Sequence, residues 1–464
     1  MAGVMPTPFS SPTPLGATQM STDRPLLERG MWQEMSAADR ADLNDRGSAK
    51  IFDPALREGV LEIIEDVRHN GDAGLIRALE KWDGISIPPD RIRVSAEEFA
   101  AAREKVSPEL LTAIRDLLAH LRSFNEQLTK HGDWSFESEP GLTVGEKVSP
   151  IASAGLFVPS GKGSYPSVMA QLGTPAVVAG VQKIAVVVPP IPGGDGEVDP
   201  AVLVVADELG IRDVFRANGP AGIAALAFGT ETVPQVRKVC GPGSPPVTCA
   251  QVEVQRFGTV SVMLLGPSES LILADDSADP YLLAADLLNE AEHGPDSTSV
   301  LVTDSQALLD AVQIEVAKQL LDLPDNRAEY ARLALGKNGG AVLTTSVEQS
   351  AEVANAFAPE HMQIAVRDEE HVLDMIVDAG EILVGQQTTV SMANFVIGCP
   401  AALPTSGYAK VSSGVTADAF RKRTAVAKSS HDALKRMSDT VIAFTRHEGF
   451  PAHEFAVTRR LEQR

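Results

Sequence analysis

Hydrophobic positions along the chain follow two periods, which divide the sequence into regions. From about residue 50 to 130, apolar side chains recur every three or four positions, as in the run PALREGVLEIIEDVRHNGDAGLIRALEKW at 54–82. This spacing predicts amphipathic helices. From about residue 150, short β-rich runs such as KIAVVV at 183–188 alternate with helical segments. A strand that is apolar on both faces is typical of a parallel sheet covered by crossover helices, so the pattern predicts a doubly wound α/β fold.

The β-rich runs fall into two sets, which predict two parallel-sheet units with boundaries near residues 150 and 267. The second set begins with SLILAD at 270–275 and continues with TSVLVTDS at 298–305. The last part of the chain differs, because residues 405–464 contain eleven Lys and Arg against six Asp and Glu. A helical tail of this sign either docks on an acidic face, its own or a partner subunit's, or is a solvated surface helix.

Composition and charge narrow the class of protein. The 464 residues are 44% hydrophobic and carry a formal net charge of −22, which is typical of a soluble globular protein and disfavours binding to nucleic acid or an anionic membrane. Three cysteines without CxxC spacing indicate a reducing compartment and no disulfide framework. Residues 1–25 are rich in Pro, Ser and Thr and resemble a flexible tail, not a signal peptide. We therefore expect a cytoplasmic protein with no nucleic-acid or membrane partner.

One short segment carries candidate acid/base chemistry. The sequence APEHM at 358–362 places Glu360 and His361 side by side. A desolvated carboxylate and an imidazole can accept protons in successive steps, because the pKa of each can lie near the operating pH. An adjacent Glu and His also occur by chance in many chains, so this interpretation requires support from elsewhere in the sequence.

A second segment is a candidate metal site. The sequence LLNEAEHGPDS at 287–297 places Glu290 and His293 three residues apart, so on a helix they share a face and could reach one cation. The alternative is an ordinary helix end, since the dipole at a helix C-terminus also favours histidine. A zinc site would need two further ligands, and the isolated His453 in EGFPAHEF could supply one.

Three glycine-containing loops predict a ligand crevice. GLFVPSGKGSYPS at 155–167 follows a predicted strand, and GPGSPP at 241–246 and GPSES at 266–270 repeat this pattern at the expected carboxyl ends of strands. Such loops allow the backbone to approach a phosphate. Each loop alone is a weak signal, because no GxGxxG is present and similar loops connect strands in many folds.

The sequence resembles the histidinol dehydrogenase family, from about residue 50 to 460. The resemblance lies in eight collinear segments, which are GLFVPSGKGSYPS, NGPAGIAALAFGTETVP, GPGSPPV, GPSES, DLLNEAEHGPDS, NAFAPEHM, ALPTSGYAKVSSGVTADAFRKRT and EGFPAHEFAVT. Eight segments in the family's order and spacing indicate membership, whereas they do not identify the substrate.

The resemblance implies a fold and an assembly. Members of this family are homodimers with two incomplete Rossmann-like parallel-sheet domains and small terminal segments that interlock the subunits. By the resemblance, residues 51–155 with 268–415 form the first domain, which carries the catalytic and metal residues, and residues 156–267 form the second. Residues 1–50 would be a tail and dimerisation segment, and residues 416–464 a helical segment that reaches the partner subunit.

The resemblance also implies a reaction. The family uses NAD and one zinc ion per chain to oxidise a primary alcohol through an aldehyde to a carboxylate. Carried over, His361 would deprotonate the hydroxyl and Glu360 would activate water for attack on the aldehyde. His293 and His453 match the zinc-binding histidines of the family.

Further positions are implied for substrate and cofactor. Ser268 matches a serine of the substrate pocket, and Glu448 matches a glutamate that reaches the substrate bound in the other subunit. The NAD site falls on four positions, which are Phe157, Pro159, Ala221 and Ser244.

Two departures from the family pattern fall in the metal site. Glu290 stands where the family usually has Gln, and Asn394 stands where it has a zinc-binding Asp. Together these changes conserve one carboxylate and one amide. We interpret them as a compensated exchange that keeps a metal, with Glu290, His293, Asn394 and His453 as ligands and zinc as the metal. The alternative is a decayed site whose charge balance is chance.

Other departures concern the substrate and the cofactor. Pro400 and Ala401 replace a polar Asn-His pair, which removes a group that a histidinol site would need. Ala221 replaces a Gln, and Ser244 an Asn, that are associated with the cofactor. We therefore expect a paralogue that oxidises another small polar alcohol or diol. A true L-histidinol dehydrogenase and a catalytically silent nucleotide- or metabolite-binding relative are the two alternatives.

Overall fold

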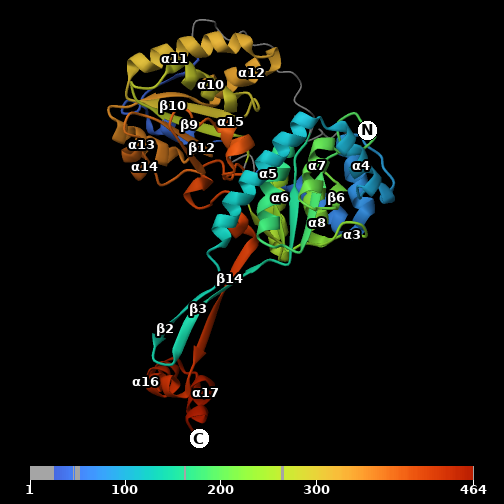
Figure 1. Ribbon diagram of the computed structural model, residues 1–464, viewed down its shortest axis with the longest axis vertical. Helices are drawn as coiled ribbons and strands as arrows, with labels where there is room; N and C mark the ends of the chain where they lie inside the picture. The colour runs from blue at the N-terminus through green and yellow to red at the C-terminus, as the bar shows by residue number, and fades with distance from the viewer. Residues whose placement is uncertain (1–25, 45, 47–52, 161–162, 263–265, 463–464) are drawn as a thin grey trace, which may run out of the picture.

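Two parallel sheets and an extended arm make up the described part of the chain (Figure 1). The computed structural model describes residues 26–44, 46, 53–160, 163–262 and 266–462. The α/β class and the two parallel-sheet units expected from the sequence are both confirmed. The expected tail at 1–25 lies outside the described residues.

One sheet has five parallel strands in the order β6-β5-β4-β7-β8. Its strands are β4 (Ser153–Phe157), β5 (Lys183–Val188), β6 (Asp213–Arg216), β7 (Lys238–Cys240) and β8 (Val260–Val262). The chain begins in the centre at β4, moves outward to β6, and then returns to the other side of β4. The strand order therefore reverses between β4 and β7, and in open α/β sheets such a switch point leaves a crevice at the carboxyl ends of the strands.

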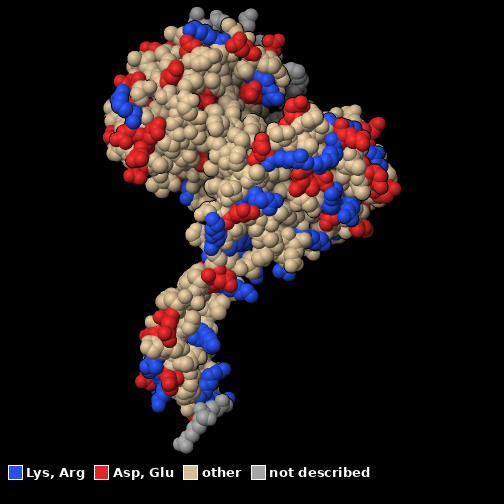
Figure 2. Space-filling model, viewed as in Figure 1, with Lys and Arg blue, Asp and Glu red and all other residues tan. Residues whose placement is uncertain are grey.

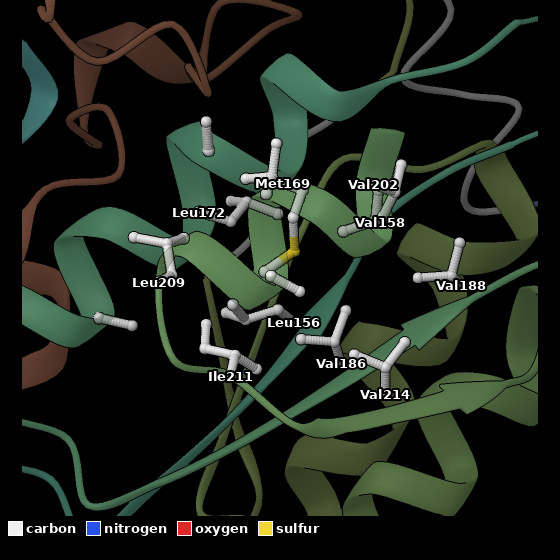
Figure 3. Packing of buried hydrophobic residues seen from close by; sticks show 14 of the residues in the cluster. Leu156, Val158, Met169, Leu172, Val186, Val188, Val202, Leu209, Ile211 and Val214 are labelled. Carbon is white, nitrogen blue, oxygen red and sulfur yellow. The ribbon is translucent and has the colours of Figure 1, made fainter. Parts of the chain in front are cut away.

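Helices cover both faces of this five-stranded sheet. One face packs on α4 (Ala96–Lys105), α5 (Pro108–Thr129), α6 (Pro166–Val178) and α7 (Pro200–Glu208). The other face packs on α3 (Pro54–Asp83), α8 (Gly219–Phe228) and α9 (Pro245–Val254). Figure 3 shows the first core, in which Leu156 and Val186 of the sheet meet Met169 and Leu172 of α6.

The helices before residue 130 lie in a different domain from the one we expected. We placed residues 51–155 with 268–415, whereas α3, α4 and α5 bury their apolar faces against the five-stranded sheet. The physical reason is that each face of this sheet exposes a continuous apolar surface, which the short helices between its own strands cover only in part. The amphipathic pattern predicted these helices correctly but not the sheet that they cover.

The second sheet has six parallel strands in the order β1-β11-β10-β9-β12-β13. Its strands are β1 (Glu28–Met31), β9 (Glu269–Ala274), β10 (Thr298–Thr303), β11 (Gly340–Leu343), β12 (His361–Ala365) and β13 (Glu381–Val384). The helices of this domain are α10 (Pro280–Ala291), α11 (Gln306–Gln319), α12 (Asp325–Leu333), α13 (Val347–Phe357), α14 (Glu369–Met375) and the short α15 (Val390–Met392).

The described part of the N-terminal segment belongs to this second domain. Residues 28–31 form the edge strand β1 beside β11, and α1 (Ala37–Asn44) follows it. Leu27 and Leu43 are both 1% exposed within the domain cores. We expected residues 1–50 to be a tail and dimerisation segment; residues 26–44 are part of the fold of their own chain and so are not a tail.

A three-stranded antiparallel arm extends from the domain of the five-stranded sheet (Figure 1). Its strands are β2 (Trp134–Glu139), β3 (Leu142–Pro150) and β14 (Arg421–Ser429), and its end carries the helices α16 (His431–Glu448) and α17 (Pro451–Glu462). We expected a helical segment over 416–464, but its first part is β14, which pairs with β3 along nine residues. Several large apolar side chains of the arm are exposed in the single chain, namely Trp134, Phe136, Val426, Phe444, Phe450 and Phe455.

The arm carries both positive and negative side chains with uncharged surface between them (Figure 2). In the part of the chain that is described, no helix is long and apolar enough to cross a membrane.

Truncation of a central-strand side chain should destabilise the five-stranded sheet. Leu156 is fully buried on β4, so we expect Leu156→Ala to lower the free energy of unfolding by about 2–5 kcal/mol, through lost burial and a cavity. Urea denaturation followed by circular dichroism measures this change. The matched control is Leu321→Ala, at a side chain that is 79% exposed, and it should change stability by less than about 0.5 kcal/mol. Equal effects of the two variants would contradict the assigned core.

Candidate active site

A cavity of about 470 Å³ lies between the two domains. Its wall contains ten of the thirteen site residues expected from the sequence: Phe157, Pro159, Ser244, Ser268, Glu290, His293, Glu360, His361, Asn394 and Ala401. The first three come from the domain of the five-stranded sheet, and the other seven from the remainder of the chain after β8. The cavity therefore requires both domains.

The two sheets present opposite edges to this cavity. Phe157 ends β4 and Ser244 follows β7, so the five-stranded sheet contributes the carboxyl edge at its switch point. His361 begins β12, and Ser268 directly precedes β9, so the six-stranded sheet contributes its amino edge. From the sequence we expected all three glycine-containing loops at the carboxyl ends of strands. The loop at 266–268 instead connects the two domains and precedes β9, so it lies at an amino edge.

Glu360 and His361 form a buried pair at the amino end of β12. They are 8% and 3% exposed, and Oε1 of Glu360 lies 3.8 Å from Nε2 of His361. Oε2 of Glu360 accepts a hydrogen bond from the backbone N–H of Glu269 at 2.9 Å. Nδ1 of His361 donates to Oε1 of Glu381 at 2.5 Å. Both side chains are thus held in place on the wall of the cavity.

Burial and charge shift the pKa of each member of this pair. Burial raises the pKa of Glu360 to about 8; His361 opposes this shift, and the Glu290 carboxylate reinforces it. Burial alone would lower the pKa of His361, but the Glu360 carboxylate and the hydrogen bond to Glu381 outweigh burial and raise it to about 10. A carboxyl and an imidazole whose proton affinities are both raised can exchange protons with a substrate and with water at one place.

Glu290 and His293 lie close together, as their spacing predicts. They occupy the carboxyl end of α10, where Oε2 of Glu290 is 3.7 Å from Nδ1 of His293. Glu290 is 1% exposed, and the buried Nδ1 of His293 has no hydrogen-bond partner among the described residues. Asn394 lines the same cavity. A buried carboxylate, an unpaired imidazole nitrogen and an amide are a donor set that fits a zinc ion, with one ligand position unfilled.

Two expected site residues lie far from the cavity within one chain. His453 is on α17, where its ring lies 5.3 Å from that of Phe450, and Glu448 ends α16. Both helices are at the end of the arm (Figure 1). Across the described residues, no group of three or more His, Cys, Asp and Glu side chains is placed to hold a metal ion. One chain therefore brings together three of the four expected ligands.

Ala221 lines a second cavity of about 230 Å³ instead of the main one. Asn218 and Ser244 line both cavities, so the two adjoin at the amino ends of α8 and α9. The second cavity also contains Asp83, whose Oδ1 accepts a hydrogen bond from Asn218 at 2.5 Å. The expected NAD positions consequently extend over two connected spaces.

A buried ion pair lies beside Glu360 and His361, and the sequence analysis missed it. Nε of Arg46 lies 2.8 Å from Oε1 of Glu269, and both side chains are at most 3% exposed. The guanidinium of Arg46 also lies 3.8 Å from the ring centroid of Phe357. Since the backbone N–H of Glu269 donates to Glu360, this ion pair holds the strand end to which the Glu360 carboxylate is bonded.

Backbone strain marks the same region. Ala358 and Ser406 are the two non-glycine residues with positive φ in the described ranges, at 52° and 54°. Ala358 ends α13 two residues before Glu360, and the N–H of Ser406 donates to Glu269 at 2.8 Å. Such conformations cost about 1–3 kcal/mol each and are retained where the surrounding structure requires them.

Removal of the cation from the buried ion pair should destabilise the protein. Arg46→Met leaves the Glu269 carboxylate buried without its partner, and we expect it to lower the free energy of unfolding by about 3 kcal/mol, as measured by urea denaturation. The double variant Arg46→Met with Glu269→Gln should recover part of this loss, because it leaves no uncompensated charge. Additive losses in the double variant would show that the pair does not act as a unit.

Comparison with known proteins agrees with the geometry of the site. A family model described as histidinol dehydrogenase matches residues 48–461. A protein named histidinol dehydrogenase homolog 2 from Mesorhizobium japonicum is 39% identical, covering 91% of this chain and 96% of the relative. The histidinol dehydrogenase of Methanosarcina barkeri is 38% identical, covering 92% of this chain and 96% of that protein.

A solved structure shows the same arrangement of the chain. The crystal structure of histidinol dehydrogenase from Elizabethkingia anophelis superposes with a TM-score of 0.89 at 32% sequence identity, covering 95% of this chain and 99% of that one. The protein accordingly belongs to the histidinol dehydrogenase family, which is a family of NAD-dependent oxidoreductases.

Proposed function

We propose that the protein oxidises a primary alcohol through an aldehyde to a carboxylate, with NAD as oxidant and zinc as metal. The observation that carries this proposal is the buried pair of Glu360 and His361 on the wall of a cavity shared by the two domains. Two proton acceptors at one place fit a reaction in which two successive steps each release a proton.

The two proton acceptors have different hydrogen-bond partners, which leave a different atom free on each. His361 has one ring nitrogen bonded to Glu381, so Nε2 is the atom that would take the proton from the substrate hydroxyl in the first step. Glu360 has one oxygen bonded to the backbone of Glu269, so Oε1 would take the proton from water as it attacks the aldehyde. Burial of both groups excludes bulk water, which would otherwise compete as the acceptor.

The cavity wall offers residues that would hold NAD and zinc. NAD, when bound, accepts the hydrides, and zinc polarises the oxygen of the substrate. Glu290, His293 and Asn394 would hold the metal, together with His453 of the partner subunit. The loops after β4 and β7, with Phe157, Pro159 and Ser244, and the adjoining cavity with Ala221, would hold the nucleotide. The amino ends of α8 and α9 lie at these spaces, and the positive end of each helix dipole favours a pyrophosphate.

A homodimer would complete the site. The arm exposes large apolar side chains on both strand and helix, among them Phe136, which is 56% exposed, and Phe444, which is 63% exposed. Surfaces of this kind are typical of protein interfaces. An arm that crosses to a second copy would bury these side chains and bring His453 and Glu448 to the cavity of that copy.

The cavity wall favours a substrate other than histidinol. Ala401, Ala402 and Leu403 line the cavity in succession, and the backbone N–H of Ala401 donates to Gln171 at 3.0 Å. This part of the wall offers no side-chain hydrogen-bond partner for an imidazole ring, so it favours a substrate that lacks one. We therefore infer a small polar alcohol or diol. L-histidinol is the second candidate, because relatives 37–39% identical to this chain are named histidinol dehydrogenase.

Oxidation of an alcohol should depend on His361. We expect the purified, zinc-loaded protein to reduce NAD with at least one member of a panel of primary alcohols and diols that includes L-histidinol, as followed by NADH absorbance. His361→Asn should lower the rate by about 10²–10⁴-fold, since it removes the acceptor of the hydroxyl proton. The control is His371→Asn at an exposed position of α14, which should leave the rate unchanged. Tight NAD binding with no turnover of any alcohol would favour a silent binding protein.

Sharing of the site between subunits can be tested by complementation. Dimers of His361→Asn alone and of His453→Ala alone should both be inactive, and the second should lose the one zinc ion per chain found in the wild type by elemental analysis. Equal co-expression of the two chains should restore about a quarter of wild-type activity, because half of the dimers then contain one intact site out of two. His447→Ala, at an exposed position of α16, is the control. No recovery in the mixture would contradict a shared site.

A further inference from the structure

Glu381 is a buried carboxylate at the candidate active site to which the proposed reaction gives no role of its own. It begins β13 and is 8% exposed. Its Oε1 lies 2.5 Å from Nδ1 of His361, and within the described residues its buried Oε2 has no hydrogen-bond partner. Burial of a carboxylate costs desolvation free energy unless a cation or strong hydrogen-bond donors compensate. His361 is the partner of Glu381 in the structure.

The backbone holds this pair rigidly. His361 and Glu381 are direct partners in the parallel pairing of β12 and β13, so their side chains project from the same face of the sheet. The N–H of Glu381 donates to the carbonyl of Glu360 at 3.0 Å, and the N–H of Gly380 donates to that of Pro359 at 2.9 Å. A Cβ at Gly380 would lie 2.5 Å from the carbonyl oxygen of Glu360, so the close approach of the strands depends on this glycine.

The hydrogen bond determines which nitrogen of His361 is free. A carboxylate accepts, so Nδ1 carries a proton and Nε2 is left as the basic atom of the neutral ring. Nε2 is on the side of Glu360, at 3.8 Å from Oε1, and both residues line the cavity. The charged groups that act on the ring are Glu360 beside it, Glu381 on β13, Glu290 on α10 and Glu269 on β9.

A purely structural role for Glu381 would require only a hydrogen-bond acceptor and not a negative charge. An amide or a backbone carbonyl would equally satisfy the N–H of a buried imidazole. A carboxylate additionally stabilises the imidazolium that forms after the ring accepts a proton. The charge of Glu381, and not only its hydrogen bond, is therefore the property that separates the two roles.

We propose that Glu381 is a positioning residue for the alcohol oxidation, which orients His361 with Nε2 toward the cavity and stabilises the imidazolium formed there. This inference rests on the proposed function. In the step concerned, the proton of the substrate hydroxyl moves to Nε2 of His361, the proton on Nδ1 stays on the ring, and no covalent bond forms with Glu381.

Measurements of kcat and KM against pH test this role. Glu381→Gln should lower kcat about tenfold or more with little change in KM, since the substrate does not contact Glu381. Loss of the carboxylate lowers the pKa of His361, so the rise of kcat with pH should begin at lower pH than in the wild type. Glu381→Asp keeps the charge and should restore part of kcat and move the profile back. Glu370→Gln, at an exposed position of α14, is the matched control.

A second measurement examines the pair without substrate. The proton of a short imidazole–carboxylate bond resonates far downfield, and we expect such a signal in the wild-type proton NMR spectrum and its loss in Glu381→Gln and in His361→Asn. An active wild type in which Glu381→Gln keeps wild-type kcat and pH profile would overturn the positioning role alone. Absence of the signal from the wild type would show that the bond does not form and would also overturn it. A wild type that oxidises no alcohol would overturn the proposed function, and the positioning role with it.

Discussion

The parallel pairing of β9, β12 and β13 is the constraint on which the candidate active site depends. It places three carboxylates and one imidazole at the amino edge of the six-stranded sheet, from Glu269, Glu360, Glu381 and His361. Buried charges of one sign repel, so this edge is stable only because each group has a partner. The partners are the imidazole, the Arg46 guanidinium and backbone N–H groups.

The two domains contribute different chemical groups to the cavity, because each faces it with a different edge of its sheet. The five-stranded sheet presents the carboxyl edge at its switch point, where loops and helix amino ends suit a phosphate-containing ligand. The six-stranded sheet presents the opposite edge, where proton acceptors are concentrated. A nucleotide held on one side and acid/base groups fixed on the other leave the space between them for a substrate.

The position of the arm accounts for the expected site residues that are missing from the cavity of a single chain. It carries His453 and Glu448 away from the cavity of its own chain and exposes aromatic side chains that folding of one chain does not bury. The proposed homodimer would account for both facts, because association would bury the exposed apolar surface and supply the missing side chains.

The sequence by itself determined the α/β class, the family and the local pairs, because these depend on periodicity and on short-range spacing such as that of Glu290 and His293. It did not determine which sheet the helices at 54–129 cover, since an apolar stripe shows that a face is buried but not against what. Nor did it reveal Glu381 or the ion pair of Arg46 and Glu269. Glu381 looks like an ordinary polar residue at the start of a strand. Only strand register and domain packing, which join residues distant in the chain, remove these charges from water and give them partners.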